Sequence, residues 1–259
     1  MRPDRALGYP VMSVDGHRVV GILGGMGPEA TVDLMRRVIA ATPARDDVDH
    51  IHMLVDNNPK VPSRIAALIE GVGSDPGPAI VEMARRLQAG GADALAIACN
   101  TAHAYADQVR SATSIPLLDM IDLTTRRISR MRLKHARVGL LASSAVVKLG
   151  LYHRRLAAHG VALVTPTDQD KLMDIIKAVK RGDSGSRNRE RFAHIAHDLM
   201  RERIDLVVIA CTELSVLAEG LDESVAALDA LEILAREIVT FGLNGDGASS
   251  PSAAAISQS

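Results

Sequence analysis

Aromatic residues are scarce in this chain: they make up 2% of its 259 residues, with two Phe, three Tyr and no Trp. Proteins that bind single-stranded nucleic acid stack the bases on aromatic side chains, so this composition argues against that class. The formal net charge of −1 provides no positive field to attract a phosphate backbone. We therefore expect no nucleic-acid partner.

Long apolar runs are also missing, although 47% of the residues are hydrophobic. No stretch approaches the roughly 20 uninterrupted apolar residues of a membrane span. Residues 1–18 carry several charges and lack the apolar middle of a signal peptide. The sequence therefore predicts a cytoplasmic protein without a membrane partner.

Only two cysteines are present, and they occupy equivalent places. Cys99 follows the apolar run at 94–98 and precedes Asn-Thr, whereas Cys211 follows the run at 206–210 and precedes Thr-Glu. A second pair of similar segments is Val-Gly-Ile-Leu at 20–23 and Val-Gly-Leu-Leu at 138–141. The offsets nearly agree, at 112 residues (211 minus 99) and 118 residues (138 minus 20). This pattern indicates a duplication that brings one thiol from each half to a shared site.

Apolar runs of strand length alternate with amphipathic stretches along the chain, which is typical of parallel sheets covered by helices on both faces. We expect an α/β fold of two pseudo-symmetric domains, each a mostly parallel sheet flanked by helices, with the active site in the cleft between them. Expected strands cover 19–23, 51–55, 92–98, 116–118, 136–141, 162–165 and 206–209. Expected helices cover 28–42, 79–89, 121–131, 145–159, 168–180, 189–202 and 228–241, with further helices opening near 101 and after 212.

The predicted organisation begins with a flexible N-terminal extension, 1–18. The first lobe spans 19–124 and is completed by the helix at 228–243, and the second lobe spans 125–227. The tail 244–259 is rich in Gly, Ser and Ala and has few large side chains to offset its ordering entropy, so we expect it to be disordered.

Both cysteines stand where parallel strands are expected to end, and ligands of such sheets bind beyond those ends. A free cysteine is often only a small buried hydrophobe. Two at matching strand ends, each leading into a helix, favour catalysis instead, because a helix N-terminus lowers the pKa of a thiol. Zinc is not expected, since no spacing supplies four ligands, and a disulfide does not fit a reducing compartment.

Other segments each allow two interpretations. The turn at 24–29, Gly-Gly-Met-Gly-Pro-Glu, either binds a carboxylate at a helix start or is purely structural; its spacing does not match a dinucleotide motif. Arg64 could clamp a carboxylate or be a solvated surface residue. Lys180 could lie near the site or cap its helix. His103 could tune Cys99 or serve packing, and Glu213 could accept an ammonium group or cap a helix.

Three segments resemble the signature segments of the aspartate/glutamate racemase family, most closely its aspartate racemase branch. They are Gly-Ile-Leu-Gly-Gly-Met-Gly-Pro at 21–28, followed by Ala-Thr; Cys-Asn-Thr-Ala-His at 99–103; and Cys-Thr-Glu-Leu at 211–214. The resemblance spans about residues 20 to 237. Glutamate racemases usually carry Thr-His where this chain has Thr212 and Glu213.

The resemblance implies a cofactor-independent amino-acid racemase with no metal, commonly a homodimer, whose substrate is a small acidic amino acid, aspartate or glutamate. Cys99 and Cys211 match the two catalytic positions, Arg64 matches an arginine for the side-chain carboxylate, and Lys180 matches a lysine near the site. The implied substrate-binding residues are Met26, Asn57, Arg64, Asn100, Thr101, Lys180, Thr212 and Glu213.

The chain departs from the family pattern at three places. Val-Pro-Ser-Arg-Ile at 61–65 replaces Ile-Pro-Asp-Arg-Thr, Ser-Ser-Ala-Val at 143–146 replaces Thr-x-Gly-Thr, and Leu-Asp-Ala at 228–230 replaces Ile-Asp-Pro. Both cysteines are retained, so these departures bear on the substrate rather than on the reaction type.

Inversion at an α-carbon requires removal of its proton from one face and return of a proton to the other, so a thiolate and a thiol on opposite walls form a two-base pair. Two alternatives stay open at this point. One is a cysteine-dependent isomerase or decarboxylase of a related dicarboxylic acid, and the other is a non-catalytic dicarboxylate-binding protein.

Overall fold

A computed structural model describes residues 17–244 of the chain. Nearly all of the predicted N-terminal extension, 1–18, and of the predicted disordered tail, 244–259, lies outside the described residues. The described part contains two four-stranded sheets, and every strand pairing within them is parallel. This confirms the predicted α/β class with two parallel sheets flanked by helices.

The first sheet has the order β2-β1-β3-β4. Its strands are β1 (Val20–Gly24), β2 (Met53–Asn57), β3 (Ala94–Ile97) and β4 (Leu117–Leu118). The helical elements joining them are α1 (Pro28–Ala41), η1 (Asp47–Asp49), η2 (Ala66–Glu70), α2 (Gly77–Ala89), η3 (Thr101–Tyr105) and α3 (Ala106–Ala112). The central strands β1 and β3 are wholly buried, as expected for a parallel sheet covered on both faces.

The second sheet repeats this order as β6-β5-β7-β8. Its strands are β5 (Arg137–Ala142), β6 (Ala162–Val164), β7 (Leu206–Ala210) and β8 (Ala227–Asp229). The helical elements joining them are α5 (Ser144–Lys148), α6 (His153–Ala157), α7 (Gln169–Lys180), α8 (Ser186–Met200), α9 (Thr212–Ser215) and η4 (Ala218–Gly220). The identical topology supports the duplication inferred from the two cysteine segments.

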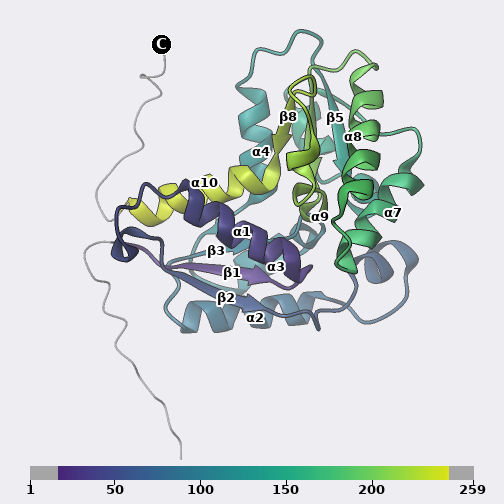
Figure 1. The fold of residues 1–259 in the computed structure, drawn as a ribbon. Helices are drawn as coiled ribbons and strands as arrows, with labels where there is room; N and C mark the ends of the chain where they lie inside the picture. Colours follow the sequence, from purple (N-terminus) through teal and green to yellow (C-terminus); the bar gives the residue numbers. More distant parts are fainter. Residues whose placement is uncertain (1–16, 245–259) are drawn as a thin grey trace, which may run out of the picture.

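The two lobes exchange the helices that follow their last strands. Helix α4 (Met120–Ser129) follows β4, yet its Ile121 and Ile128 belong to the core of the second sheet, with Val138 and Leu140. Helix α10 (Ala230–Leu243) follows β8 and lies beside α1 over the first sheet (Figure 1). The exchange couples the lobes through their hydrophobic cores.

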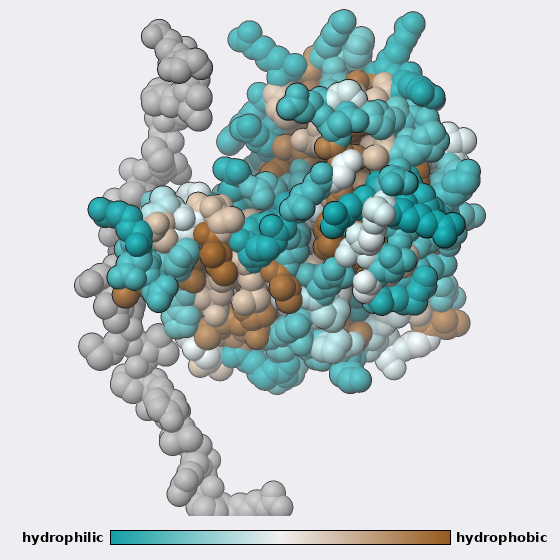
Figure 2. Space-filling model, in the orientation of Figure 1, coloured by the Kyte–Doolittle hydropathy of each residue, from teal (hydrophilic) through white to brown (hydrophobic). Residues whose placement is uncertain are grey.

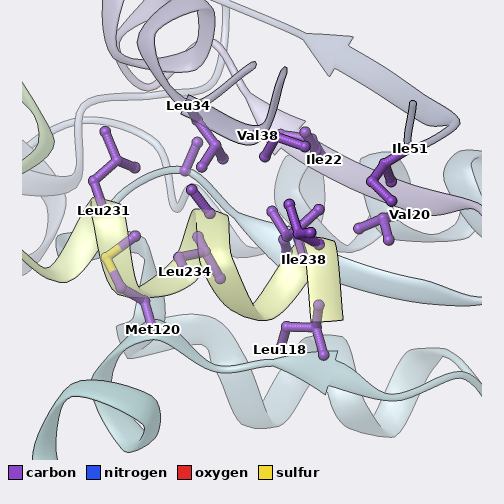
Figure 3. Packing of buried hydrophobic residues seen from close by; sticks show 14 of the residues in the cluster. Val20, Ile22, Leu34, Val38, Ile51, Leu118, Met120, Leu231, Leu234 and Ile238 are labelled. Carbon is purple, nitrogen blue, oxygen red and sulfur yellow. The ribbon is translucent and has the colours of Figure 1, made fainter. Parts of the chain in front are cut away.

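Helix α10 supplies one face of the first lobe's core. Leu231, Leu234 and Ile238 recur at helical spacing and face Leu34 and Val38 of α1 (Figure 3). All five side chains are fully buried. Helix α10 therefore packs on the first sheet although it follows the last strand of the second.

Two local expectations were wrong. The helix expected at 145–159 is two short helices, because Gly150 has a φ of +63° that interrupts the α-conformation. The helix expected from 228 begins at Ala230, because residues 227–229 form the edge strand β8. The helix expected after Thr212 is present and has a single turn. Strand β8 was missed because three residues are too few to show the alternating pattern by which a strand is recognised in a sequence.

Most of the face shown in Figure 2 is hydrophilic, with apolar surface over α1 and the neighbouring strands. Val32 and Ile39, seven residues apart on α1, are 59% and 49% exposed. Among residues 17–244, no helix combines the length and the apolarity that crossing a bilayer requires.

Candidate functional site

The two cysteines lie beyond equivalent strand ends. Cys99 follows β3 and Cys211 follows β7. Each of these strands is the third along the chain in its own sheet, and each has a neighbouring strand on both sides. Both thiols are free and buried, with 6% and 5% of each residue exposed. Parallel strands direct their carboxyl ends to one edge of the sheet, where open α/β sheets bind ligands.

Both thiols line one small, partly open cavity at the junction of the lobes. The first lobe contributes Ser63, Arg64, Ile65, Cys99 and Thr101, and the second contributes Ser143, Ile176, Lys180, Cys211 and Glu213. The cavity has a volume of about 20 Å³. That space holds a single water molecule, so an amino acid enters only when the walls move apart.

Three side chains of the second lobe are linked in series at this cavity by a hydrogen bond and an ion pair. The Cys211 Sγ–H donates to Glu213 Oε2 over 3.1 Å, and Glu213 Oε1 lies 3.4 Å from Lys180 Nζ. Burial lowers the pKa of Lys180, but the negative charge of the Glu213 carboxylate is the main cause that opposes it, so the net pKa is raised and the ammonium stays charged.

The pKa of the Cys211 thiol contradicts one expectation from the sequence. Burial, and then the charge and hydrogen bond of Glu213, raise this pKa well above its ordinary value, with Lys180 offsetting part of the effect. Helix α9 has only one turn and therefore a small dipole, so it cannot overcome burial and an adjacent carboxylate. Cys211 is a thiol at neutral pH.

Arg64 presents part of its guanidinium to the cavity. Nη1 donates to the carbonyls of Val61 and Pro62 at 3.2 and 2.9 Å, and Nη2 donates to the carbonyl of Met26 at 3.1 Å. Of the five N–H bonds of an arginine, Nε–H is buried without a partner within residues 17–244. The free Nε edge can receive an oxygen of a carboxylate.

The remaining predicted substrate-binding residues divide into two groups. Thr101 and Glu213 line the cavity, together with Arg64 and Lys180. Met26, Asn57, Asn100 and Thr212 are absent from its lining. Met26 is buried and reaches the site only through its carbonyl on Arg64, while Asn57 is exposed at the end of β2.

The residues after each cysteine are hydrogen-bonded to the opposite lobe. Tyr152 OH donates to Asn100 Oδ1 over 2.6 Å, and the hydroxyls of Thr101 and Ser143 are 3.1 Å apart. The Thr212 hydroxyl donates to the Ala98 carbonyl over 3.4 Å. Asn100 Nδ2 is buried and has no partner in the described part of the chain. This N–H₂ group therefore has no acceptor among the described residues, although Asn100 does not line the cavity.

His103 has a packing and positioning role rather than contact with sulfur. Its Nδ1 donates to the Cys99 carbonyl over 2.9 Å, since Nε2 accepts from Met120 N–H at 3.2 Å. Burial is the main cause that lowers the pKa of His103, in spite of the opposing charge of Asp119. A neutral imidazole therefore joins the end of β3 to the start of α4.

Four lining residues were not among the predicted site residues: Ser63, Ile65, Ser143 and Ile176. The first three belong to segments that depart from the racemase pattern, and this departure was the signal that could have found them. Ile176 lies four residues before Lys180 on α7, so both project from one face of that helix.

A larger cavity, about 1040 Å³, lies elsewhere along the lobe junction, between α1, α10 and the η4–β8 segment. Neither cysteine lines it. We place the candidate site at the smaller cavity because the nucleophilic and cationic groups converge there. In the part of the chain that the structure describes, no three His, Cys, Asp or Glu side chains are grouped to hold a metal ion.

Comparison with known proteins identifies the family. The model of the Asp/Glu/Hydantoin racemase family matches residues 23–238, most of the chain. The chain belongs to this family. An aspartate racemase from Picrophilus torridus is 32% identical, with a TM-score of 0.76 over 86% of this chain and 93% of that one.

Two further relatives fit this family assignment. The broad specificity amino-acid racemase RacX of Bacillus subtilis is 24% identical over 227 residues, covering 86% of this chain and 97% of RacX. The glutamate racemase isoform RacE1 of Bacillus anthracis shares the fold, with 21% identity and a TM-score of 0.62 over 87% of this chain and 81% of that one. Amino-acid racemisation is the activity that the family supports.

Proposed function

We propose that this protein is a cofactor-independent racemase of aspartate or glutamate that works with two thiols. The observation that carries the proposal is the convergence of Cys99 and Cys211, one from each lobe, on a cavity bordered by Arg64 and Lys180. Two cations beside one carboxylate, Glu213, favour an anionic substrate.

The two thiols have different starting states in this mechanism. Cys211 is protonated and is the proton donor in this scheme, so the role of the base that removes the α-proton from the other side falls to Cys99. The electron pair of the broken C–H bond passes into an enediolate, and Cys211 delivers its proton to the opposite face. Cys99 then holds a proton and Cys211 is a thiolate, and exchange with solvent restores the first state.

Lys180 and nearby N–H groups support the charge that develops. The ammonium of Lys180 balances Glu213 in the resting site and the additional Cys211 thiolate after turnover. We assign the unpartnered N–H₂ of the Asn100 side chain to the α-carboxylate once the cavity walls move apart to admit the substrate, and donors placed where charge develops lower the barrier. We assign the side-chain carboxylate of the substrate to the Nε edge of Arg64.

Racemisation in D₂O tests the proposal. The reduced protein, without pyridoxal phosphate, is incubated with L- or D-aspartate, then with glutamate and a panel of neutral amino acids, and α-proton loss is followed by NMR. The panel includes aliphatic amino acids because Ile65 and Ile176 give the cavity an apolar wall. Exchange with inversion of an acidic amino acid is the expected result. Silence across the panel with both thiols free would overturn the proposal in favour of a binding protein or another substrate class.

Replacing Arg64 by alanine tests its carboxylate role. Loss of a charge-assisted hydrogen bond costs about 1.5–3 kcal/mol, so kcat/KM for an acidic substrate is expected to fall roughly 10- to 150-fold. A neutral amino acid that the enzyme turns over should lose far less. The control is Lys60→Ala, which removes an exposed cation four residues away. Equal losses for acidic and neutral substrates would show that Arg64 acts only through its bonds to the carbonyls.

A cytoplasmic homodimer is also part of the proposal. The resemblance to aspartate racemases supports it, and so does the exposed apolar surface that includes Val32 and Ile39 of α1, because large exposed apolar patches commonly mark contact surfaces.

A further inference from the structure

A buried arginine of the first lobe contacts the one-turn helix that follows Cys211 in the second lobe. Arg37 lies on α1, and its side chain is only 13% exposed. Its Nη2 donates to the carbonyl of Ser215, the last residue of α9, over 2.9 Å. Helices α1 and α9 are in contact, although 178 residues separate the two partners (Figure 1).

Carboxylates fix Arg37 from two other sides. Its Nε donates to Asp33 Oδ2 on the same helix over 2.8 Å, and its Nη1 lies 3.0 Å from Asp229 Oδ2. Nη1 also donates to Glu232 Oε2 over 3.3 Å. Burial lowers the pKa of Arg37, but Asp229 and Asp33 raise it by more, so the guanidinium remains a cation.

Asp229 connects this cation to the same short helix a second time. Its Oδ1 accepts the hydroxyl of Ser215 over 2.7 Å and the backbone N–H of Leu231 over 2.9 Å, where α10 begins. The Ser215 residue is 1% exposed. Both the carbonyl and the hydroxyl of Ser215 are therefore held by the Arg37–Asp229 pair.

Helix α9 depends on such external contacts. Forming the first turn of a helix is unfavourable in free energy, and stability comes only from the residues that extend it. Helix α9 stops after that first turn, so it is not stable by itself. Its first residues follow Cys211, and its backbone carries Glu213, the partner of the thiol. The Ser215 N–H bonds back to the Cys211 carbonyl over 3.2 Å, so a displacement at Ser215 is transmitted to the cysteine.

We infer that Arg37 and Asp229 are positioning residues for the reaction: from behind the site, they hold α9 so that Cys211 and Glu213 face the thiol of the other lobe. The expected change in turnover rests on the proposed function. The expected change in the position of Cys211, and so in its alkylation, rests only on the contacts described above.

The neighbouring Arg36 provides a matched control. It lies on the same helix and pairs with the same Asp33, at 2.7 Å, but its side chain is 62% exposed and its other partner is the exposed Glu219. Arg36→Lys and Arg37→Lys both retain a positive charge, but only Arg37→Lys removes the guanidinium that contacts Asp33, Asp229 and Ser215 at once. Arg37→Met removes the charge as well.

Two measurements on these variants test the inference. We expect Arg37→Met to lower kcat on the order of 10²-fold with little change in KM, since Arg64 and Lys180 still bind the substrate and a small misplacement of a reacting group has this cost. Arg37→Lys should recover part of the loss, and Arg36→Lys should match the wild type. Iodoacetamide labelling followed by peptide mass spectrometry should show faster alkylation of Cys211, with Cys99 unchanged, only in the Arg37 variants.

The outcomes separate this inference from the proposed function. If the wild type racemises nothing, the proposed function fails, and the alkylation of Cys211 relative to Cys99 still decides the inference. The inference would be overturned if Arg37→Lys and Arg36→Lys had the same kcat and the same rate of alkylation at Cys211. If Arg37→Met does not fold, Ser215→Ala removes only the hydroxyl bond to Asp229, and the same selective labelling of Cys211 is expected.

Discussion

Changing either thiol to a hydroxyl, as Cys99→Ser or Cys211→Ser, is expected to lower kcat for racemisation by about 10²- to 10⁴-fold. A serine hydroxyl is a far weaker acid than a thiol, so it neither becomes the base nor donates a proton readily to a carbanion. Serine nearly preserves the side-chain volume, and both positions are buried, so folded, monodisperse protein should be obtained. The chain has two cysteines, and a thiol titration should count one in each variant.

The stereochemistry of the residual reaction distinguishes a two-base site from a single catalytic cysteine. With one thiol left, the enzyme can remove an α-proton from one face and return deuterium to that same face. Each variant should then exchange the α-proton of one enantiomer in D₂O without inversion, and the two variants should act on opposite enantiomers. Full racemase activity in either variant, or exchange of the same enantiomer by both, contradicts the two-base mechanism.

Much of the fold could be predicted because the relevant signals are local. Central strands such as β1 and β7 are continuous apolar runs, and the repeated pattern around the cysteines indicated two equivalent sheets. The packing of α4 against the second sheet has no such local signal. A helix with one apolar stripe shows that it packs, but the stripe does not say against which sheet.

The sequence named residues that the structure brings to one candidate site, but it did not indicate the contacts that surround them. The cysteines, Arg64 and Lys180 were named from the sequence, and the structure brings them to one cavity. Contacts between lobes, such as Arg37 to Ser215 or Tyr152 to Asn100, join positions 178 and 52 residues apart, and no periodicity relates them. The raised pKa of Cys211 was missed for a related reason, because it comes from burial and from how Glu213 is oriented rather than from the helix that follows.

Replacing Glu213 by glutamine is expected to make Cys211 more reactive and the enzyme less active. The carboxylate raises the pKa of the Cys211 thiol by its charge and hydrogen bond, so its removal lowers that pKa and leaves Lys180 free to stabilise the thiolate. Alkylation of Cys211 should therefore begin at a lower pH than in the wild type. Racemisation should fall on the order of 10²-fold, the scale of one acid–base contribution, because Cys211 is then no longer held as the proton donor.

The control for this change is Glu219→Gln, which removes a carboxylate of the same segment that is 67% exposed and paired with Arg36. It should alter neither the onset of Cys211 alkylation nor kcat. Iodoacetamide labelling across a pH series, with the Cys99 peptide as the internal reference, measures the shift. If the onset at Cys211 stays in place or moves to higher pH in Glu213→Gln, the carboxylate does not hold the thiol proton. Burial alone would then set the protonation of Cys211, and the asymmetry between the two thiols would need no contribution from Glu213.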